Sequence, residues 1–264
     1  MTGFNKATIP LLLGAILITA ILAGILPGCP KEDTTVDFTE DGVIPDAQIP
    51  PIDASAPAQT ETATFALGCF WAPDSRFGSL DGVIRTRVGY AGGTTESPTY
   101  HNLGDHTETI QIDYDPTQIS YEQLLEIYWD SHDPTVRPLS RQYMSIVFYH
   151  NSEQRKLAME TKQHEEASLG RRVYTEIIPF SEFHLAEDYH QKYYLQQIPS
   201  LMKELAAIYP NFADFIDSTV SARINGYLRG HGTFQDLQEQ LSSFGLSPAG
   251  NEIVLEIGRR LLSD

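Results

Sequence analysis

Gly68-Cys69-Phe70-Trp71 is the stretch of sequence that decides the fold. Residues 63–67 before it form an apolar run typical of a short buried strand, and Gly68 lets the backbone turn without a Cβ clash. The sequence therefore predicts Cys69 at a helix start, where unpaired N–H groups and the helix dipole favour a thiolate. The alternative is a small buried hydrophobic residue beside two core aromatics. The strand–Gly–Cys–helix context favours a nucleophile, as does the fact that no cysteine follows Cys69.

Composition limits the classes of partner. The chain has 264 residues, 41% of them hydrophobic, which is enough for one sizeable core. Its 18 basic and 35 acidic side chains give a net charge of -17, which argues against nucleic acid and against polybasic docking on an anionic membrane. The two cysteines, Cys29 and Cys69, cannot form a disulfide framework.

The N-terminal residues 1–29 have the pattern of a targeting segment. Lys6 supplies a positive start, 9–26 is an uncharged apolar run, and Pro27-Gly28-Cys29 follows it. This resembles the lipobox of bacterial lipoproteins, in which the cysteine is lipidated, although Pro27 is unusual there. An uncleaved anchor helix is the alternative. Both interpretations predict a membrane-anchored, extracytoplasmic protein, periplasmic or on the cell surface.

The rest of the chain divides by composition. Residues 30–61 are acidic and Pro-rich and predict a disordered linker. Residues 62–198 alternate strands and helices, which predicts an α+β domain with a mixed sheet. Its expected strands are 63–67, 83–90, 108–114, 144–149 and 173–180, and its expected helices begin at Ser120, span about 152–169 and span 185–197. Residues 199–264 have helical periodicity and predict a helical C-terminal extension without extractable chemistry.

Several short motifs occur in a fixed order and carry a family resemblance. They are Gly68-Cys69-Phe70-Trp71, Gly89-Tyr90-Ala91-Gly92-Gly93, Pro98-Thr99-Tyr100, His106-Thr107-Glu108, His132-Asp133-Pro134, Gln142-Tyr143 and Ala186-Glu187-Asp188-Tyr189-His190-Gln191. In this order they resemble the A-type peptide methionine sulfoxide reductases. The resemblance implies a two-layer α+β fold with a ferredoxin-like core, and a cysteine at the start of the first helix.

The resemblance also implies roles for particular residues in reducing the S epimer of methionine sulfoxide, free or in proteins. Cys69 is the nucleophile and becomes a sulfenic acid, and Glu108 donates a proton to the sulfoxide oxygen. Tyr100 and Tyr143 hydrogen-bond that oxygen, while Phe70 and Trp71 form the pocket for the methyl group. Without the resemblance, Glu108 reads as an edge-strand surface carboxylate and the Phe-Trp pair as core.

Three positions depart from the family pattern. Pro138 stands where the family has an Asp five residues before the second tyrosine, so that carboxylate is absent. Asp74 replaces a Glu five residues after the cysteine, and Met144 replaces an Arg after the second tyrosine. Asp133 belongs to the separate His-Asp-Pro motif and takes no role here.

The cysteine count predicts how the enzyme is recycled. Many family members use a second, resolving cysteine, which is missing after Cys69, so an external thioredoxin-like dithiol is expected to attack the oxidised Cys69. We expect no metal, because His184 and His190 lack ligand spacing, and no cofactor, because residues 89–93 have neither the ending of a phosphate loop nor the spacing of a dinucleotide loop. We also expect a monomer.

Two other functions remain open. One is a domain that keeps the sulfoxide pocket and binds a ligand without turnover. The other is a thiol enzyme of the same fold that acts on other sulfoxides or on peroxide.

Overall fold

The computed structural model describes residues 49–263. The predicted anchor at 1–29 with Cys29, and most of the predicted linker, lie outside the described residues. No helix in the described part is long and apolar enough to cross a membrane.

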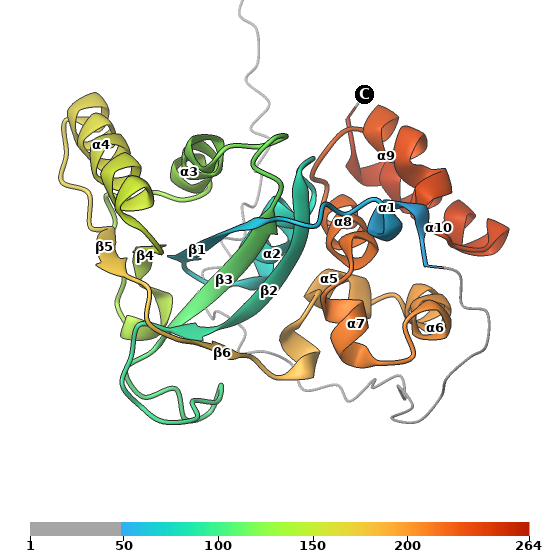
Figure 1. Ribbon diagram of the computed structural model, residues 1–264, viewed down its shortest axis with the longest axis horizontal. Coiled ribbons are helices and arrows are strands. Elements are labelled where there is room, and N and C mark those ends of the chain that lie inside the picture. Colours follow the sequence, from blue (N-terminus) through green and yellow to red (C-terminus); the bar gives the residue numbers. More distant parts are fainter. Residues whose placement is uncertain (1–48, 264) are drawn as a thin grey trace, which may run out of the picture. The chain divides into compact units, whose positions relative to one another are not determined.

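The described elements alternate through the first two thirds of the chain and are helical in the last third (Figure 1). The strands are β1 (Glu61–Leu67), β2 (Val83–Ala91), β3 (Thr107–Tyr114), β4 (Ser145–Tyr149), β5 (Glu176–Pro179) and β6 (Phe183–Leu185). The α-helices are α1 (Pro51–Ala54), α2 (Trp71–Gly78), α3 (Tyr121–Asp130), α4 (Ser152–Leu169), α5 (Tyr193–Gln196), α6 (Pro199–Ile208), α7 (Phe212–Ile216), α8 (Thr219–Tyr227), α9 (Phe234–Gln240) and α10 (Pro248–Leu261). Three 3-10 turns are η1 (Arg141–Tyr143), η2 (Asp188–His190) and η3 (Leu241–Ser243).

The strands form one mixed sheet in the order β5-β4-β1-β3-β2-β6. The pairings are antiparallel except that of β4 with β5, which is parallel. Helix α2 connects β1 to β2, and α3 connects β3 to β4, so the central order β4-β1-β3-β2 is a βαββαβ arrangement. The predicted α+β class and ferredoxin-like core are confirmed.

Alternation along the strands gives the sheet two buried faces. Phe65 of β1 packs with residues of α2, α3 and α4 in one large apolar cluster. Its neighbour Ala66 faces the other way and packs with Ile146 and Phe148 of β4. Helix α3 begins where the sequence predicts, because Ser120 accepts from Gln123 N–H while the Gln123 side chain accepts from Ser120 N–H.

The structure corrects the predicted helix at 185–197. Leu185 ends β6, which pairs with β2, and a 3-10 turn and a four-residue helix follow. The Gln191 side chain both accepts from Val88 N–H and donates to Val88 C=O, at 3.0 and 2.8 Å. Lys192, the N-cap of α5, has φ of 50°, in the left-handed region that a continuous right-handed helix does not contain. Aromatic content suggested a helix here, but side-chain bonds to β2 set the backbone.

The structure also corrects the end of the predicted disordered linker. Residues 49–60 are described, and they include α1. Asp53 accepts from the backbone N–H groups of Thr219 and Val220, at 2.8 and 3.3 Å, and its other oxygen accepts from the Tyr209 hydroxyl. Asp53, which lies in the acidic segment predicted to be a linker, therefore binds N–H groups at the start of α8.

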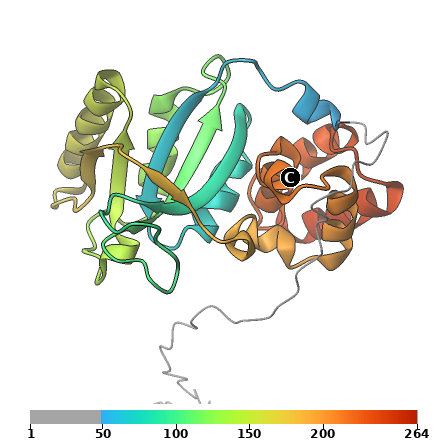
Figure 2. The same ribbon diagram turned by 60° about the horizontal axis from the view of Figure 1, so that its bottom comes forward.

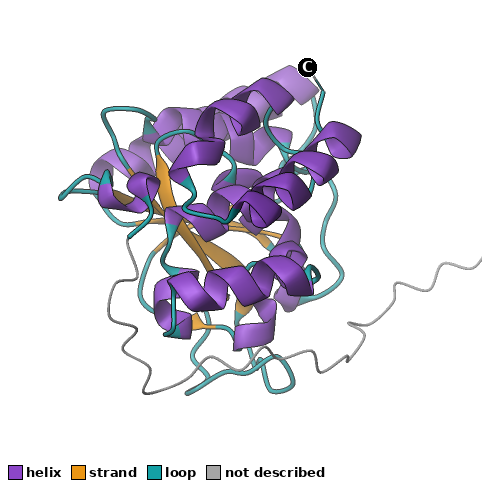
Figure 3. Ribbon diagram, turned by 90° about the vertical axis from the view of Figure 1, so that its right-hand side faces the viewer, coloured by secondary structure: helices purple, strands orange, loops and turns teal. Residues whose placement is uncertain are grey.

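Helices α6 to α10 lie together beside β2 and α2, on the other side from α4 (Figures 1 and 2). Figure 3 looks from that side, with these helices in front of the strands. The predicted helical character of 199–264 agrees with these elements. The sequence predicts a domain boundary at residue 198. The described residues on both sides of it belong to one compact unit, so this boundary stays a prediction.

A buried ion pair connects Asp74 of α2 to Lys192, the residue directly before α5. The Lys192 ammonium lies 3.1 Å from the Asp74 carboxylate, with side chains 0% and 1% exposed. Thr86 of β2 donates its hydroxyl to Asp74 at 2.6 Å, and Asn225 of α8 donates its amide at 3.3 Å. Lys192 also donates to the Thr86 carbonyl. Burial lowers the pKa of Lys192, and the Asp74 charge opposes that shift.

Removing the ammonium should be costly, because it leaves the Asp74 carboxylate buried without a cation. We expect Lys192→Met to lower the free energy of unfolding by about 3–5 kcal/mol in urea denaturation. The control is Lys156→Met, since Lys156 is exposed on α4 and its ammonium lies 3.9 Å from Glu160. That change should cost less than about 1 kcal/mol. Equal costs for the two variants would contradict the assigned role of the pair.

Candidate active site

Cys69 lies in the turn between β1 and α2, as the sequence predicts. Gly68 has φ of 94°, a backbone conformation that favours glycine, and it turns the chain from strand to helix. Phe70 is the N-cap of α2, so Cys69 stands one residue before the cap. The thiol is exposed. It therefore lies beside the N–H end of a helix and within reach of a substrate.

Glu108 is buried near the start of β3, with 1% of its surface exposed. Because β3 lies between β1 and β2, the alternative of an edge-strand surface carboxylate is wrong. One carboxyl oxygen, Oε2, accepts from Phe70 N–H at 3.1 Å, and the other, Oε1, accepts from Gln142 Nε2 at 2.7 Å. Burial raises the pKa of Glu108 to about 7, and the two hydrogen bonds oppose that rise.

These two hydrogen bonds connect predicted site residues that are distant in sequence. Phe70 directly follows Cys69, and Gln142 directly precedes Tyr143, the last residue of η1. Tyr143 is 38% exposed. The Glu108 carboxyl is therefore bonded to the neighbours of both the predicted nucleophile and one predicted phenol.

The aromatic side chains of Phe70, Trp71, Tyr90 and Tyr100 form a cluster beside this carboxyl, here called the aromatic wall. Phe70 is 2% exposed and packs with Val88, Tyr90 and Ala186, and the partly buried Trp71 and Tyr100 border the same cluster. Phe70 is thus a core residue as well as a candidate pocket residue.

His190 holds the wall together. Trp71 Nε1 donates to His190 Nδ1 at 3.2 Å, and the Tyr100 ring lies 4.9 Å from the His190 ring. The Trp71 indole also stacks on Tyr193, with ring centroids 3.6 Å apart. Burial lowers the pKa of His190 to about 4, so the imidazole is neutral at pH 7.

The sequence prediction missed several residues that shape the site. Gln142 and His190 belong to the family motifs, but the sequence alone assigns a role to neither of them. The sequence alone assigns no role to Glu187 either. In the structure its carboxylate accepts from the Tyr90 hydroxyl at 2.7 Å and from Tyr100 N–H at 2.9 Å. The motif at 186–191 was the available signal, because its polar residues bond strand β2 and the aromatic wall.

Other predicted positions lie apart from this chemistry. Asp133 accepts from the hydroxyl and the N–H of Thr135, in a local turn. Asp74, the departure after the cysteine, belongs to the buried ion pair, and Met144 packs against apolar residues of the sheet. Among the described residues there is no group of three His, Cys, Asp or Glu side chains that could hold a metal ion.

Comparisons with known proteins agree with this geometry. The family model described as peptide methionine sulfoxide reductase matches residues 61–223. A peptide methionine sulfoxide reductase of Drosophila melanogaster is 42% identical over 189 residues, which cover 71% of this chain and 76% of that protein. The peptide methionine sulfoxide reductase MsrA of Methanosarcina acetivorans is 43% identical over 145 residues, covering 51% of this chain and 77% of that protein.

A solved structure supports the same assignment. Methionine sulfoxide reductase A of Corynebacterium diphtheriae matches with a TM-score of 0.50 and 31% identity, covering 66% of this chain and 92% of that one. The predicted enzyme class, an oxidoreductase that reduces methionine sulfoxide with a thiol, is confirmed. The family model spans more than half of the chain and includes Cys69, Glu108 and their hydrogen-bond partners, and on this evidence the chain belongs to the A-type peptide methionine sulfoxide reductase family.

Proposed function

We propose that Cys69 and Glu108 together reduce the S epimer of methionine sulfoxide in this chain. One observation carries the proposal: the buried Glu108 carboxyl accepts from Phe70 N–H at 3.1 Å, one residue after the exposed Cys69. Reduction needs a thiolate that attacks sulfur and an acid that protonates the departing oxygen. A carboxyl whose pKa burial raises to about 7 can carry that proton at neutral pH.

The reaction balances with these two groups. The Cys69 thiolate attacks the sulfoxide sulfur while Glu108 gives its proton to the sulfoxide oxygen. The methionine S–O bond breaks and a Cys69 S–O bond forms, so the methionine sulfur is reduced and Cys69 becomes a sulfenic acid. The N–H groups of Phe70 and Gln142 fix the carboxyl, one at each oxygen, and leave its own proton for the substrate.

We propose that the aromatic wall determines which epimer of the sulfoxide binds. Phe70 and Trp71 offer an apolar surface for the sulfoxide methyl group, and His190 and Tyr193 hold the Trp71 indole in place. Tyr100 and Tyr143 are proposed to donate their hydroxyls to the sulfoxide oxygen. When the methyl group and the oxygen are both fixed, the configuration at sulfur decides where the rest of the methionine side chain points. Only one epimer directs the peptide out of the pocket, and that epimer is the one reduced.

Recycling requires a thiol from another molecule. The sequence has no cysteine after Cys69, so a thioredoxin-like dithiol is proposed to attack the sulfenic acid. One donor sulfur forms a mixed disulfide with Cys69 and releases water. The second donor sulfur then attacks that disulfide, which restores the Cys69 thiol and leaves the donor oxidised.

Replacing the proton donor should slow the reductive step and change its pH dependence. In the native chain, the rate of methionine formation in a quenched single turnover should fall as pH rises through about 7, where Glu108 loses its proton. Glu108→Gln should lower this rate by roughly 10²- to 10⁴-fold and remove that fall. The control is Glu126→Gln, because Glu126 is exposed on α3. An unchanged rate and profile in Glu108→Gln would exclude Glu108 as the acid.

The predicted membrane attachment rests on sequence alone. Lys6, the apolar run at 9–26 and Cys29 support an anchor, lipidated or helical, that holds a monomeric enzyme outside the cytoplasm. Protease added to intact cells or spheroplasts should therefore digest the catalytic part while a cytoplasmic marker survives. Protection of the catalytic part until the membrane is lysed would place it inside.

A further inference from the structure

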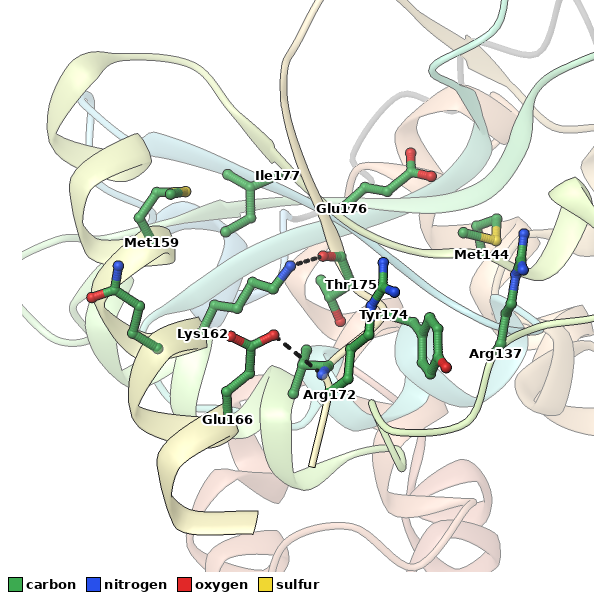
Figure 4. A pocket seen from close by; sticks show the side chains of 12 residues that line it. Arg137, Met144, Met159, Lys162, Glu166, Arg172, Tyr174, Thr175, Glu176 and Ile177 are labelled. Atoms are coloured by element: carbon green, nitrogen blue, oxygen red, sulfur yellow. Dashed lines mark hydrogen bonds between the residues drawn. The ribbon is translucent and has the colours of Figure 1, made fainter. Parts of the chain in front are cut away.

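A trough of about 730 Å³ opens on the surface at the sheet edge formed by β5. Figure 4 shows its two sides, with Lys162 and Glu166 on α4 facing Arg137 and Met144 across the segment that carries Arg172 to Ile177. None of the residues assigned above to the reductive chemistry lines it.

The charges in the trough favour an anion. Three cationic side chains line it, against two carboxylates that already have partners. Glu176 forms a salt bridge with Arg141 at 2.8 Å, and Glu166 accepts from Val173 N–H at 3.2 Å. The trough is thus locally positive on a chain whose net charge is -17.

Two arginines are available to bind that anion. Arg137 and Arg172 are exposed, and within the part of the chain that the structure describes neither forms a salt bridge. The Arg172 guanidinium lies 5.1 Å from the ring centre of Tyr174, which supports it on one face. An arginine held in this way can donate two parallel N–H bonds to a carboxylate.

The trough is close to the reacting cysteine along the sheet. Met144, which lines it, directly follows Tyr143. Ser145 pairs with Leu67, two residues before Cys69, and Ile146 pairs with Glu176 of β5, so the three strands present this end together. β5 lies two strands from β1, which is about 10 Å at the usual strand spacing. An extended peptide crosses these strands in about three residues, and needs more to reach Arg172, which precedes β5 by four residues.

We propose that this trough binds an acidic side chain of the oxidised polypeptide substrate, three or more residues from the methionine sulfoxide. The inference rests on the proposed function of Cys69, because it places the sulfoxide there. Arg137 and Arg172 bind the carboxylate, while the apolar parts of Met144, Met159 and Ile177 contact the rest of the substrate chain. The trough thereby makes acidic sequences around an oxidised methionine the preferred substrate class.

Binding to Cys69→Ser tests this directly, since that variant cannot turn over. Fluorescence anisotropy would compare labelled eleven-residue peptides that carry a central methionine sulfoxide and, three to five residues to one side or the other, Glu, Gln or Lys. With the charged residue on one of the two sides of the methionine sulfoxide, we expect the Glu peptide to bind about three- to tenfold more tightly than the Lys peptide at low salt. The difference should vanish at about 0.5 M salt, which screens exposed charges.

Two further variants, made in the Cys69→Ser chain, locate the preference. Arg137→Gln combined with Arg172→Gln should abolish the difference between the Glu and Lys peptides. Arg260→Gln should preserve it, because Arg260 is exposed on α10 and pairs with Glu256. Equal binding of the Glu and Lys peptides to Cys69→Ser, or a preference that survives in the double arginine variant, would overturn the proposal.

A short substrate separates this result from the proposed function. N-acetyl-methionine sulfoxide N-methylamide is too small to reach from Cys69 to the trough. If the native chain reduces it but the peptides show no charge preference, the trough proposal alone fails. If the native chain forms no methionine from it, the proposed function fails, and the trough proposal fails with it.

Discussion

The buried ion pair between Asp74 and Lys192 is the interaction on which the rest of the structure depends. Both charges are out of water, so each must keep its partner, and the pair is completed by Thr86 of β2 and Asn225 of α8. Asp74 lies on α2, five residues after Cys69. The ion pair therefore ties the helix behind the nucleophile to the sheet and to a C-terminal helix at the same point, which makes α8 part of the scaffold of the active site.

Within residues 49–263 no cation pairs with the second of these buried carboxyls, Glu108, and this difference separates a structural group from a chemical one. Glu108 accepts from the Phe70 N–H and from the side-chain N–H of Gln142, and burial raises its pKa to about 7. Two carboxylates near the start of α2 thus have different tasks. Asp74 stays in an ion pair that fixes the helix, while Glu108 can hold a proton for the substrate. His190, whose pKa burial lowers to about 4, is neutral at pH 7 and adds no positive charge to the neighbouring aromatic wall.

Local pattern predicted the elements well where the determinants are local. The strand before Cys69, the Gly68 turn and the Ser120 capping box all depend on residues within a few positions of each other. The predicted helix at 185–197 failed because strand β2, a hundred residues earlier, takes the side-chain bonds of Gln191.

The candidate site depended on the family motifs for the same reason. Nothing in the sequence near Glu108 shows that it is buried in a central strand, and its partner Gln142 lies 34 residues away. The most direct test of the whole account uses Cys29→Ser, in which Cys69 is the sole thiol. We predict one methionine per chain from a peptide S-sulfoxide without reductant, none after the further change Cys69→Ser, and many turnovers with reduced thioredoxin. Methionine formed without Cys69, or none formed while Cys69 still reacts with iodoacetamide, would contradict the account.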